Sequence, residues 1–308
     1  MAYFIGIDGG GTKTECILGD DENVRARITA PSCKIQTVGK MAAQVVIQNA
    51  IRGVCKQAKV DPERVSRICI GVAGYSGQGI AAALTAMVWE VVRIAVDVVG
   101  DHTIGMQAAF GDGPGVLVIA GTGSIAYGRD ERGRMVRVGG WGPAISDEGS
   151  GNWIGRRAVG AMMRTADRGQ FTALEKRIMD LFNVRRREDV ATVANQKGLA
   201  EFAKLAPDVM EAARAGDMLA AEILNQAGAE LAALAEDVIR HLWPHARQDV
   251  IPVGVVGGVF RNVEEVRFAF ERSLRSRRTD VMPLRELVDP AVGALELARR
   301  EAARKVSV

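Results

Sequence analysis

The chain is poor in cysteine. Its 308 residues include four, Cys16, Cys33, Cys55 and Cys69, and no two of them form a Cys-x-x-Cys pair. Zinc sites and iron–sulfur clusters are usually built on such close pairs. The sequence therefore predicts neither kind of site, and we expect reduced thiols, as in a cytoplasmic protein.

A long apolar segment is also missing. The first apolar run meets Asp8 after a few residues, and no stretch approaches the roughly 18 apolar residues that a membrane span needs. The N-terminus lacks the charged and then apolar pattern of a secretion signal. These absences predict a cytoplasmic protein with no membrane partner.

The sequence has no block of basic residues. Its 40 Lys and Arg residues are mixed with 37 Asp and Glu residues, which gives a formal net charge of +3. Proteins that bind the nucleic acid backbone concentrate their positive charge, so we expect no nucleic acid partner. Apolar residues, in contrast, are plentiful. At 48% of this length they suffice for the cores of two domains.

Strand and helix patterns alternate along the chain, which predicts an α/β fold. A glycine turn joins the first two strands into a hairpin. A Gly/Asp/Pro segment at 111–115 separates two halves, and the second half contains an Ala- and Leu-rich helical insert at about 171–248. The predicted strands lie at 3–8, 14–19, 24–29, 68–73, 94–99, 116–120 and 251–256, and the predicted helices include 41–58, 80–92, 262–275 and 289–304.

A carboxylate meets three consecutive glycines in FIGIDGGGTKTECIL, residues 4–18. Glycines in a hairpin turn permit positive φ and leave no Cβ, so backbone N–H groups can approach a phosphate closely. Asp8 would be repelled by phosphate and is suited instead to hold Mg²⁺ against it. The simpler alternative is a tight hairpin whose Asp caps the turn. The predicted phosphate contacts are Gly9, Gly10, Gly11, Thr12, Lys13 and Thr14.

Two further glycine elements follow strands in the second half. Strand 116–120 runs into a turn made of Gly121, Thr122, Gly123 and Ser124, which is the same phosphate-binding device. Strand 251–256 ends in Gly257 and Gly258, where a flat ring can lie against bare backbone. Three such elements in this order predict an ATP site.

The segments IDGGGTKT (7–14), GTGS (121–124) and VVGGVFRN (255–262) resemble the phosphate and adenosine motifs of the actin/Hsp70/sugar-kinase ATPase superfamily. Within it, GGWGPAISDEGSGNWIG (139–155) resembles the signature of the N-acetylglucosamine kinase and BadF/BadG/BcrA/BcrD ATPase family. The resemblance implies two ribonuclease-H-like domains with mixed five-stranded sheets flanked by helices, hinged around a central cleft. The first would comprise 1–112 with about 291–308, and the second 113–290. The resemblance also suggests a homodimer.

Asp101 occupies the position at which the family places its catalytic Asp, between a predicted strand and a helix pattern. A carboxylate there would accept the proton of a sugar hydroxyl and orient it toward the γ-phosphoryl group. The alternative is that Asp101 only caps the helix. The family usually has Asn-Asp at this point, whereas this chain has Gly100 before Asp101.

The resemblance implies that Asp147, Thr122 and Gly140 contact the sugar, while Glu148 is expected to cap the helix that opens near residues 149–153. Kinases of this group for N-acetylglucosamine usually carry Pro-Ser-x-Asn after the third strand, with the Asn on the sugar. Here Lys34 replaces that Asn. A lysine would repel a glucosamine amine and tolerate a neutral hexose or a carboxylate-bearing sugar such as N-acetylmuramic acid. Alternatively, Lys34 points into solvent.

These features predict an ATP- and Mg²⁺-dependent kinase for an amino sugar or a related hexose derivative. One alternative is a BadF/BadG-type ATPase that activates a partner protein, although the clustered cysteines of an iron–sulfur site are missing. A second is a nucleotide-binding regulator without catalysis, which the presence of both Asp8 and Asp101 disfavours. The zinc-dependent repressor/kinase relatives are disfavoured because their Cys-rich loop is missing.

Overall fold

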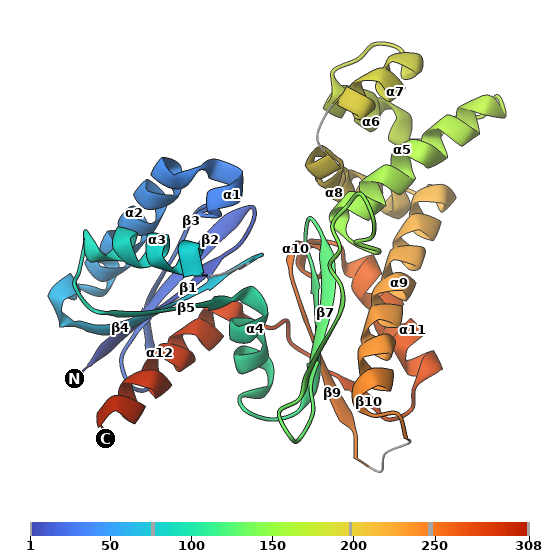
Figure 1. The fold of residues 1–308 in the computed structure, drawn as a ribbon. Coiled ribbons are helices and arrows are strands. Elements are labelled where there is room, and N and C mark those ends of the chain that lie inside the picture. The colour runs from blue at the N-terminus through green and yellow to red at the C-terminus, as the bar shows by residue number, and fades with distance from the viewer. Residues whose placement is uncertain (1, 75–77, 197–198, 246–248, 307–308) are drawn as a thin grey trace. The chain divides into compact units, whose positions relative to one another are not determined.

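The computed structural model describes residues 2–74, 78–196, 199–245 and 249–306. The chain forms two compact units (Figure 1). Unit 1 comprises Met1–Asp112 and Val288–Val308, and unit 2 comprises Gly113–Leu287. The last helix therefore belongs to the same unit as the first strand, although almost the whole chain separates them.

Unit 1 is built on a five-stranded mixed sheet with the order β3-β2-β1-β4-β5. The first three strands form an antiparallel meander, and β4 and β5 run parallel to β1. The strands are β1 (Tyr3–Gly9), β2 (Lys13–Gly19), β3 (Val24–Pro31), β4 (Val65–Val72) and β5 (Ala95–Gly100). The helices are α1 (Ile35–Val38), α2 (Lys40–Ala58), η1 (Pro62–Arg64), α3 (Gln78–Trp89), α4 (Asp101–Phe110) and α12 (Pro290–Val306).

Helices cover both faces of this sheet, with α2 and α3 on one side and α4 and α12 on the other (Figure 1). Successive strand residues point to opposite faces, so Ile5 packs in the core under α2 while Phe4 packs in the core under α12. Gly6 is required by the second contact, because a β-carbon there would lie 2.4 Å from the backbone nitrogen of Leu295. The sheet is therefore buried on both faces.

Unit 2 contains a second five-stranded mixed sheet with the order β10-β9-β6-β7-β8. Its strands are β6 (Gly115–Ala120), β7 (Ser124–Arg129), β8 (Met135–Gly139), β9 (Ile251–Val256) and β10 (Val281–Pro283). The long helix α9 packs on β6, β7 and β8, and α11 packs along α9 (Figure 1). The helices are α5 (Gly151–Asp167), α6 (Leu174–Phe182), α7 (Arg187–Gln196), η2 (Leu199–Leu205), α8 (Ala206–Arg214), α9 (Met218–Leu242), α10 (Gly258–Asn262) and α11 (Glu264–Arg277).

The predicted fold class, two mixed five-stranded sheets flanked by helices, is confirmed. The edge strand β10 was not predicted, because three residues ending in proline carry no periodic signal. The helix predicted at 262–275 is wrong in its start, since α10 ends at Asn262 and α11 begins at Glu264.

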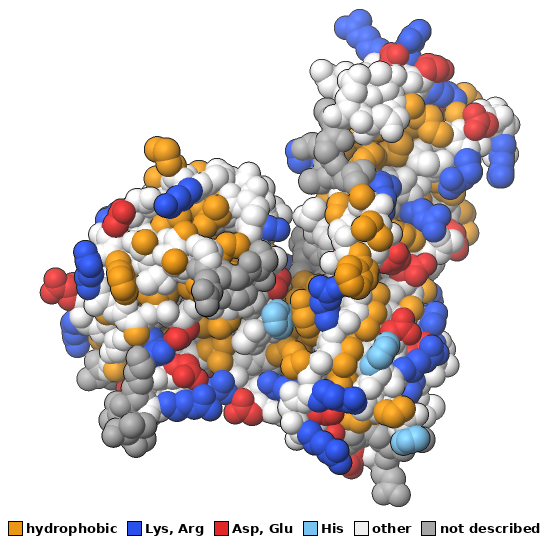
Figure 2. All heavy atoms as spheres, viewed as in Figure 1, with side chains coloured by type: hydrophobic (Ala, Val, Ile, Leu, Met, Phe, Trp, Pro, Cys, Tyr) orange, Lys and Arg blue, Asp and Glu red, His pale blue; other side chains and the backbone are white. Residues whose placement is uncertain are grey.

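The distribution of charge on the surface and the composition of the helices can be compared with the expectation of no nucleic acid and no membrane partner. On the face shown in Figure 2, basic and acidic side chains are interspersed over both units. Within the described residues, none of the helices combines the length and the apolarity that crossing a membrane requires.

Candidate active site

The strands of unit 1 bring three predicted site residues to one end of its sheet, where β1, β4 and β5 have their carboxyl ends. We call this end the sheet edge. Strands β1, β4 and β5 are parallel, and their register aligns Gly9 with Val72 and Val72 with Gly100. Asp8 therefore lies one residue before this row and Asp101 one residue after it, on strands separated only by β4. Strand β3 also ends at this edge, just before Lys34. Parallel strands commonly present ligand sites at their carboxyl ends.

The carboxylate of Asp8 is held in an unfavourable electrostatic environment. Its pKa is raised from the ordinary 3.8 to about 7, mainly by burial and next by the nearby charge of Asp101. Lys13 opposes these effects only weakly. A cation placed here would relieve the repulsion between the two carboxylates.

The first glycine turn is built without left-handed backbone. None of Gly9, Gly10 and Gly11 has positive φ, so the turn does not use the backbone freedom that glycine permits. The turn depends instead on the absence of a β-carbon at these positions. A β-carbon on Gly9 would lie 2.9 Å from the sulfur of Cys33, whereas the space around Gly11 is open. Gly11 thus presents bare backbone to any ligand that approaches the turn.

The polar side chains of this turn divide into exposed and buried groups. Thr12 is exposed, and Lys13 donates to Glu15 over 2.6 Å. Thr14 is fully buried, and its hydroxyl oxygen accepts the backbone N–H of Cys33 at 3.0 Å. Thr14 therefore anchors the loop after β3, which leaves Thr12 as the exposed hydroxyl of the turn.

The loop after β3 is hydrogen-bonded to the glycine turn. The Ser32 hydroxyl donates to the carbonyl of Gly10 at 2.8 Å and accepts the backbone N–H of Lys34 at 3.2 Å. Lys34 does not extend freely into solvent. Its side chain is half-buried, and its ammonium lies 3.7 Å from where a β-carbon on Gly74 would be. Because Gly74 follows β4, this ammonium lies at the same sheet edge as Asp8.

Asp101 is the first residue of α4, and Gly100 occupies the N-cap position. The capping alternative is therefore wrong. The Asp101 carboxylate accepts the adjacent N–H of His102 at 2.8 Å and lies 3.9 Å from the Nδ1 atom of the His102 ring. The half-buried His102 ring lies over Gly100, where a β-carbon would be 2.4 Å from Cε1. A side chain at position 100 would therefore require the His102 ring to move.

In unit 2, the second glycine turn is fixed against the start of α5. The carbonyl of Gly121 accepts the N–H of Gly151 at 2.9 Å, and that of Thr122 accepts the N–H of Asn152 at 3.2 Å. The Thr122 side chain is exposed, and nothing lies within 4 Å of a β-carbon built on Gly121. Neither Gly121 nor Gly123 has positive φ. As in unit 1, the turn offers uncovered backbone and one exposed hydroxyl.

Asp147 ties this turn to the loop that precedes α5. It is only 5% exposed and has a φ of 72°, which is unusual for a residue other than glycine. Burial raises the pKa of its carboxyl, while hydrogen bonds from the backbone N–H groups of Ser124 and Gly142 lower it. The charge of Arg156 on α5 also favours the ionised form. Arg156 was not singled out in the sequence, because an arginine one turn into a helix is usually a solvated residue.

Two serines hold the same loop. The hydroxyl of Ser124, which is 3% exposed, donates to the carbonyl of Glu148 at 2.7 Å. The Ser150 side chain caps α5 by accepting the N–H of Trp153 at 3.1 Å, so the expectation that Glu148 caps this helix is wrong. Gly140 has a φ of 70° and lies against Ile125. Ser124, like Thr14, thus points inward and supports a loop.

The third glycine element lies beside the second. Parallel pairing aligns Ile119 on β6 with Val256 on β9, and a β-carbon on Gly257 would be 2.2 Å from the carbonyl oxygen of Ala120. Gly257 also has a φ of 112°, so any side chain here would be strained as well as blocked. Gly258 begins α10. The predicted phosphate turn and the predicted adenosine turn are therefore neighbours at the end of one sheet.

No group of three or more His, Cys, Asp and Glu side chains is arranged to hold a metal ion within the ranges that the structure describes. Magnesium usually binds one or two carboxylates and completes its shell with phosphate oxygens and water, so a site of that kind would need fewer protein ligands than such a group supplies.

Comparison with known proteins gives the family. The model of the BadF/BadG/BcrA/BcrD ATPase family matches residues 5–298. The chain belongs to this family. The resemblance predicted from the glycine motifs and the segment 139–155 is thereby confirmed, and it extends over nearly the whole of this chain.

The family members most informative for this chain are named as sugar kinases. The N-acetylmuramic acid/N-acetylglucosamine kinase of Clostridium acetobutylicum is 32% identical over 306 residues, covering 98% of this chain and 99% of its own. The N-acetyl-D-glucosamine kinase of Dictyostelium discoideum is 28% identical, covering 96% and 97%. A solved structure from Chromobacterium violaceum, of a protein proposed to be an N-acetylglucosamine kinase, has a TM-score of 0.76 at 27% identity and covers 97% and 99% of the two chains.

Proposed function

We propose that this protein is an ATP-dependent kinase that transfers the γ-phosphoryl group of ATP to a hydroxyl group of an amino sugar. The observation that carries the proposal is the pairing of Asp8 and Asp101 at one sheet edge, beside an open glycine turn. A cation-binding carboxylate and a second carboxylate near it are what phosphoryl transfer to a hydroxyl requires. The sugar kinases that match along nearly their entire length support the same reaction class.

The glycine elements are assigned to ATP. Gly11 and Gly121 have open space where a β-carbon would stand, so their backbone can approach phosphate oxygens. Thr12 and Thr122 supply exposed hydroxyls. Gly257 and Gly258, next to the second turn, are assigned to the adenosine.

Asp8 is assigned to Mg²⁺, which when bound would neutralise charge on the phosphates. The raised pKa of Asp8 supports this assignment, because a carboxylate that is costly to ionise alone is stabilised by a cation. Asp101 is assigned as the general base. Its carboxylate is partly exposed, so it can accept the proton of a sugar hydroxyl and turn the oxygen toward the phosphorus atom.

Sugar contacts are assigned in each unit separately, to residues near Asp101 in unit 1 and near Asp147 in unit 2. Asp147, Thr122 and Gly140 belong to the turn and loop that the buried Asp147 carboxylate joins in unit 2. Lys34 belongs to unit 1, where the residue is half-buried and its ammonium has no hydrogen-bond or ion-pair partner among the described residues. An unpaired ammonium favours a substrate with a carboxylate, and N-acetylmuramic acid is such a sugar. We therefore include it with N-acetylglucosamine as a candidate substrate.

The alternative function, an ATPase that activates a partner through an iron–sulfur cluster, is disfavoured by burial of the cysteines. Cys16, Cys33, Cys55 and Cys69 are each at most 1% exposed. Burial raises the pKa of Cys69 to about 12, which keeps this thiol protonated. A cluster shared between subunits needs thiolates that reach the surface.

The test is ADP release from Mg-ATP in the presence of N-acetylglucosamine, glucosamine, glucose, N-acetylmannosamine or N-acetylmuramic acid. We expect release to depend on one or more of the amino sugars, with stoichiometric formation of a sugar phosphate. ATP turnover that is indifferent to every sugar would contradict the proposal and favour the protein-activating alternative. An absence of turnover with all of them would also contradict it.

A further inference from the structure

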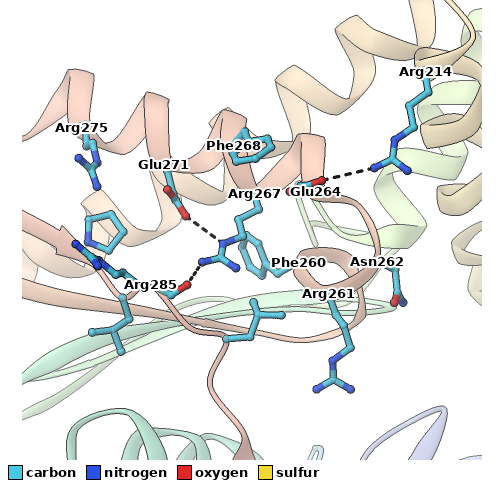
Figure 3. A pocket seen from close by; sticks show the side chains of 13 residues that line it. Arg214, Phe260, Arg261, Asn262, Glu264, Arg267, Phe268, Glu271, Arg275 and Arg285 are labelled. Carbon is cyan, nitrogen blue, oxygen red and sulfur yellow. Dashed lines mark hydrogen bonds and ion pairs between the residues drawn. The ribbon is translucent and has the colours of Figure 1, made fainter.

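A second concave site lies in unit 2 along the outer side of α11, and residues 260–262 of α10, the helix that follows the adenosine turn, line one end of it (Figure 3). Its volume is about 550 Å³, within the range of small-molecule sites. One wall is the exposed face of α11, and the other is the segment 283–287 that follows β10. We call this site the α11 groove. The side chains used below are Arg261, Arg267, Phe268, Arg275, Leu284 and Arg285.

Both walls of the groove are fixed. The α11 helix packs along α9, and the N–H of Leu284 donates to the carbonyl of Val253 on β9 at 2.8 Å. Arg267 joins the two walls, because its guanidinium donates to the carbonyl of Arg285 and to Glu271 at 3.1 Å (Figure 3). A ligand would therefore meet a preformed site, which reduces the entropy lost on binding.

The charges in the groove are unbalanced. Its lining contains five arginines and two glutamates. The glutamates already have partners, since Glu271 accepts from Arg267 and Glu264 lies 3.8 Å from Arg214. Arg261, Arg275 and Arg285 have exposed side chains without an ion-pair partner among the described residues. Three guanidinium groups around one concavity create a positive potential that attracts anions.

The groove also has an apolar surface. Phe268 projects from α11 and is 60% exposed, which is unusual for a phenylalanine in a packed helix. Leu284 and Leu287 lie on the opposite wall. The ring face and the guanidinium groups together match a ligand that has both a flat apolar part and an anionic part.

We propose that the α11 groove is a binding site for a small phosphate ester that carries an aromatic or heterocyclic ring. The guanidinium fork of arginine matches phosphate oxygens in pairs, so the phosphate belongs with Arg275 and Arg285. The ring belongs against Phe268. The α10 helix links the groove to the adenosine turn, because it begins at Gly258 and contains Arg261. This link rests on the proposed function: if a ligand in the groove changes the affinity for ATP, ATP must change the affinity for that ligand by the same factor.

The probe is 1-naphthyl phosphate, titrated into the full-length protein by isothermal titration calorimetry. Mg²⁺ and a non-hydrolysable ATP analogue are kept saturating in one titration and are left out of a second one. We expect one site, with inorganic phosphate and 1-naphthol each binding at least about tenfold more weakly than the ester, since each lacks half of the contacts. Higher salt concentration should lower the protein's affinity for the ester.

The variants separate the groove from the rest of the surface. The affinity for the ester should fall at least about tenfold in each of the variants Arg275→Glu, Arg285→Glu and Phe268→Ser. Arg272→Glu makes the same charge change on α11 outside the groove and should leave the affinity within about twofold. Equal weakening by Arg272→Glu, or no binding of the ester by the wild type at millimolar concentration, would overturn the proposal. The titration without nucleotide tests binding to the groove independently of ATP, so it is informative whether or not the protein proves to be a kinase.

Discussion

Asp8 and Asp101 interact across a single intervening strand. The register of β1, β4 and β5 brings them to one sheet edge, where burial and then the charge of Asp101 raise the pKa of Asp8 to about 7. Two carboxylates that repel each other destabilise the fold unless something compensates. The pair therefore connects stability, cation binding and catalysis.

The first prediction concerns stability without magnesium. Asp8 binds its proton more tightly in the folded state, so the free energy of unfolding should fall as pH rises from the ordinary value of 3.8 to about 7. The loss is at most roughly 4 kcal/mol, the equivalent of that pKa difference. The substitution Asp8→Asn removes the group that ionises and with it this loss of stability. The variant should therefore be more stable than the wild type at pH 8 and equally stable at pH 4.

Urea unfolding of both proteins in EDTA measures the difference, and Asp21→Asn serves as the control because Asp21 is exposed in a turn of the same unit. Mg²⁺ with an ATP analogue should stabilise the wild type at pH 8 and have a smaller effect on Asp8→Asn. A variant that is less stable than the wild type at pH 8 would show that the ionised Asp8 is not strained.

The second prediction concerns the base. Asp101→Asn keeps the shape of the side chain and removes its ability to accept a proton, so kcat should fall at least about a hundredfold while the KM for the sugar changes little. The Asp101 carboxylate contacts the neighbouring residue His102, whose N–H an Asn oxygen can also accept, so the fold should not suffer. Steady-state kinetics and a thermal melt check both points. Near-normal turnover would remove Asp101 from the mechanism.

Features that depend on residues close together in the sequence could be predicted, whereas features that depend on distant residues could not. The hairpin, the buried strands and the long α9 follow from local periodicity. The inward orientation of Thr14 and Ser124 does not, because a strand's alternation assigns a face only once its neighbours are known. The positive φ of Asp147 is likewise set by distant partners, the amides of Ser124 and Gly142. Glycine permits both positive φ and close approach, and the structure shows that Gly9 to Gly11 have no positive φ.

The third prediction compares two glycines of one turn. A β-carbon on Gly123 would lie 2.7 Å from Oδ2 of Asp147, which two backbone amides hold in place. Gly123→Ala should therefore cost about 1–3 kcal/mol of stability. Gly121 has open space, so Gly121→Ala should fold normally.

The proposed phosphate contact at Gly121 is where the two variants should differ in function. An added methyl group would meet the phosphate there, so we expect the KM for ATP to rise at least about fivefold in Gly121→Ala with little change in melting temperature. An unchanged KM for ATP would mean that phosphate does not approach Gly121 closely.

The fourth prediction concerns the choice of sugar. The Lys34 ammonium is half-buried against Gly74 in a loop that Ser32 ties to Gly10, so it is held near the sheet edge where Asp101 lies. If it binds the carboxylate of N-acetylmuramic acid, Lys34→Asn should lower kcat/KM for that sugar at least about tenfold, the usual value of a charge-assisted hydrogen bond. The value for N-acetylglucosamine, which has no carboxylate, should change less than about threefold.

Lys40→Asn is the matched control, because it removes the same charge from an exposed position a few residues along the chain. Long-range attraction of an anionic sugar would weaken equally in both variants and would disappear at high salt, whereas direct contact is specific to Lys34 and persists. An equal loss with both sugars in Lys34→Asn would instead make the lysine a support of the loop. The ratio of the two sugars' kcat/KM values, measured in both variants, therefore decides what Lys34 does.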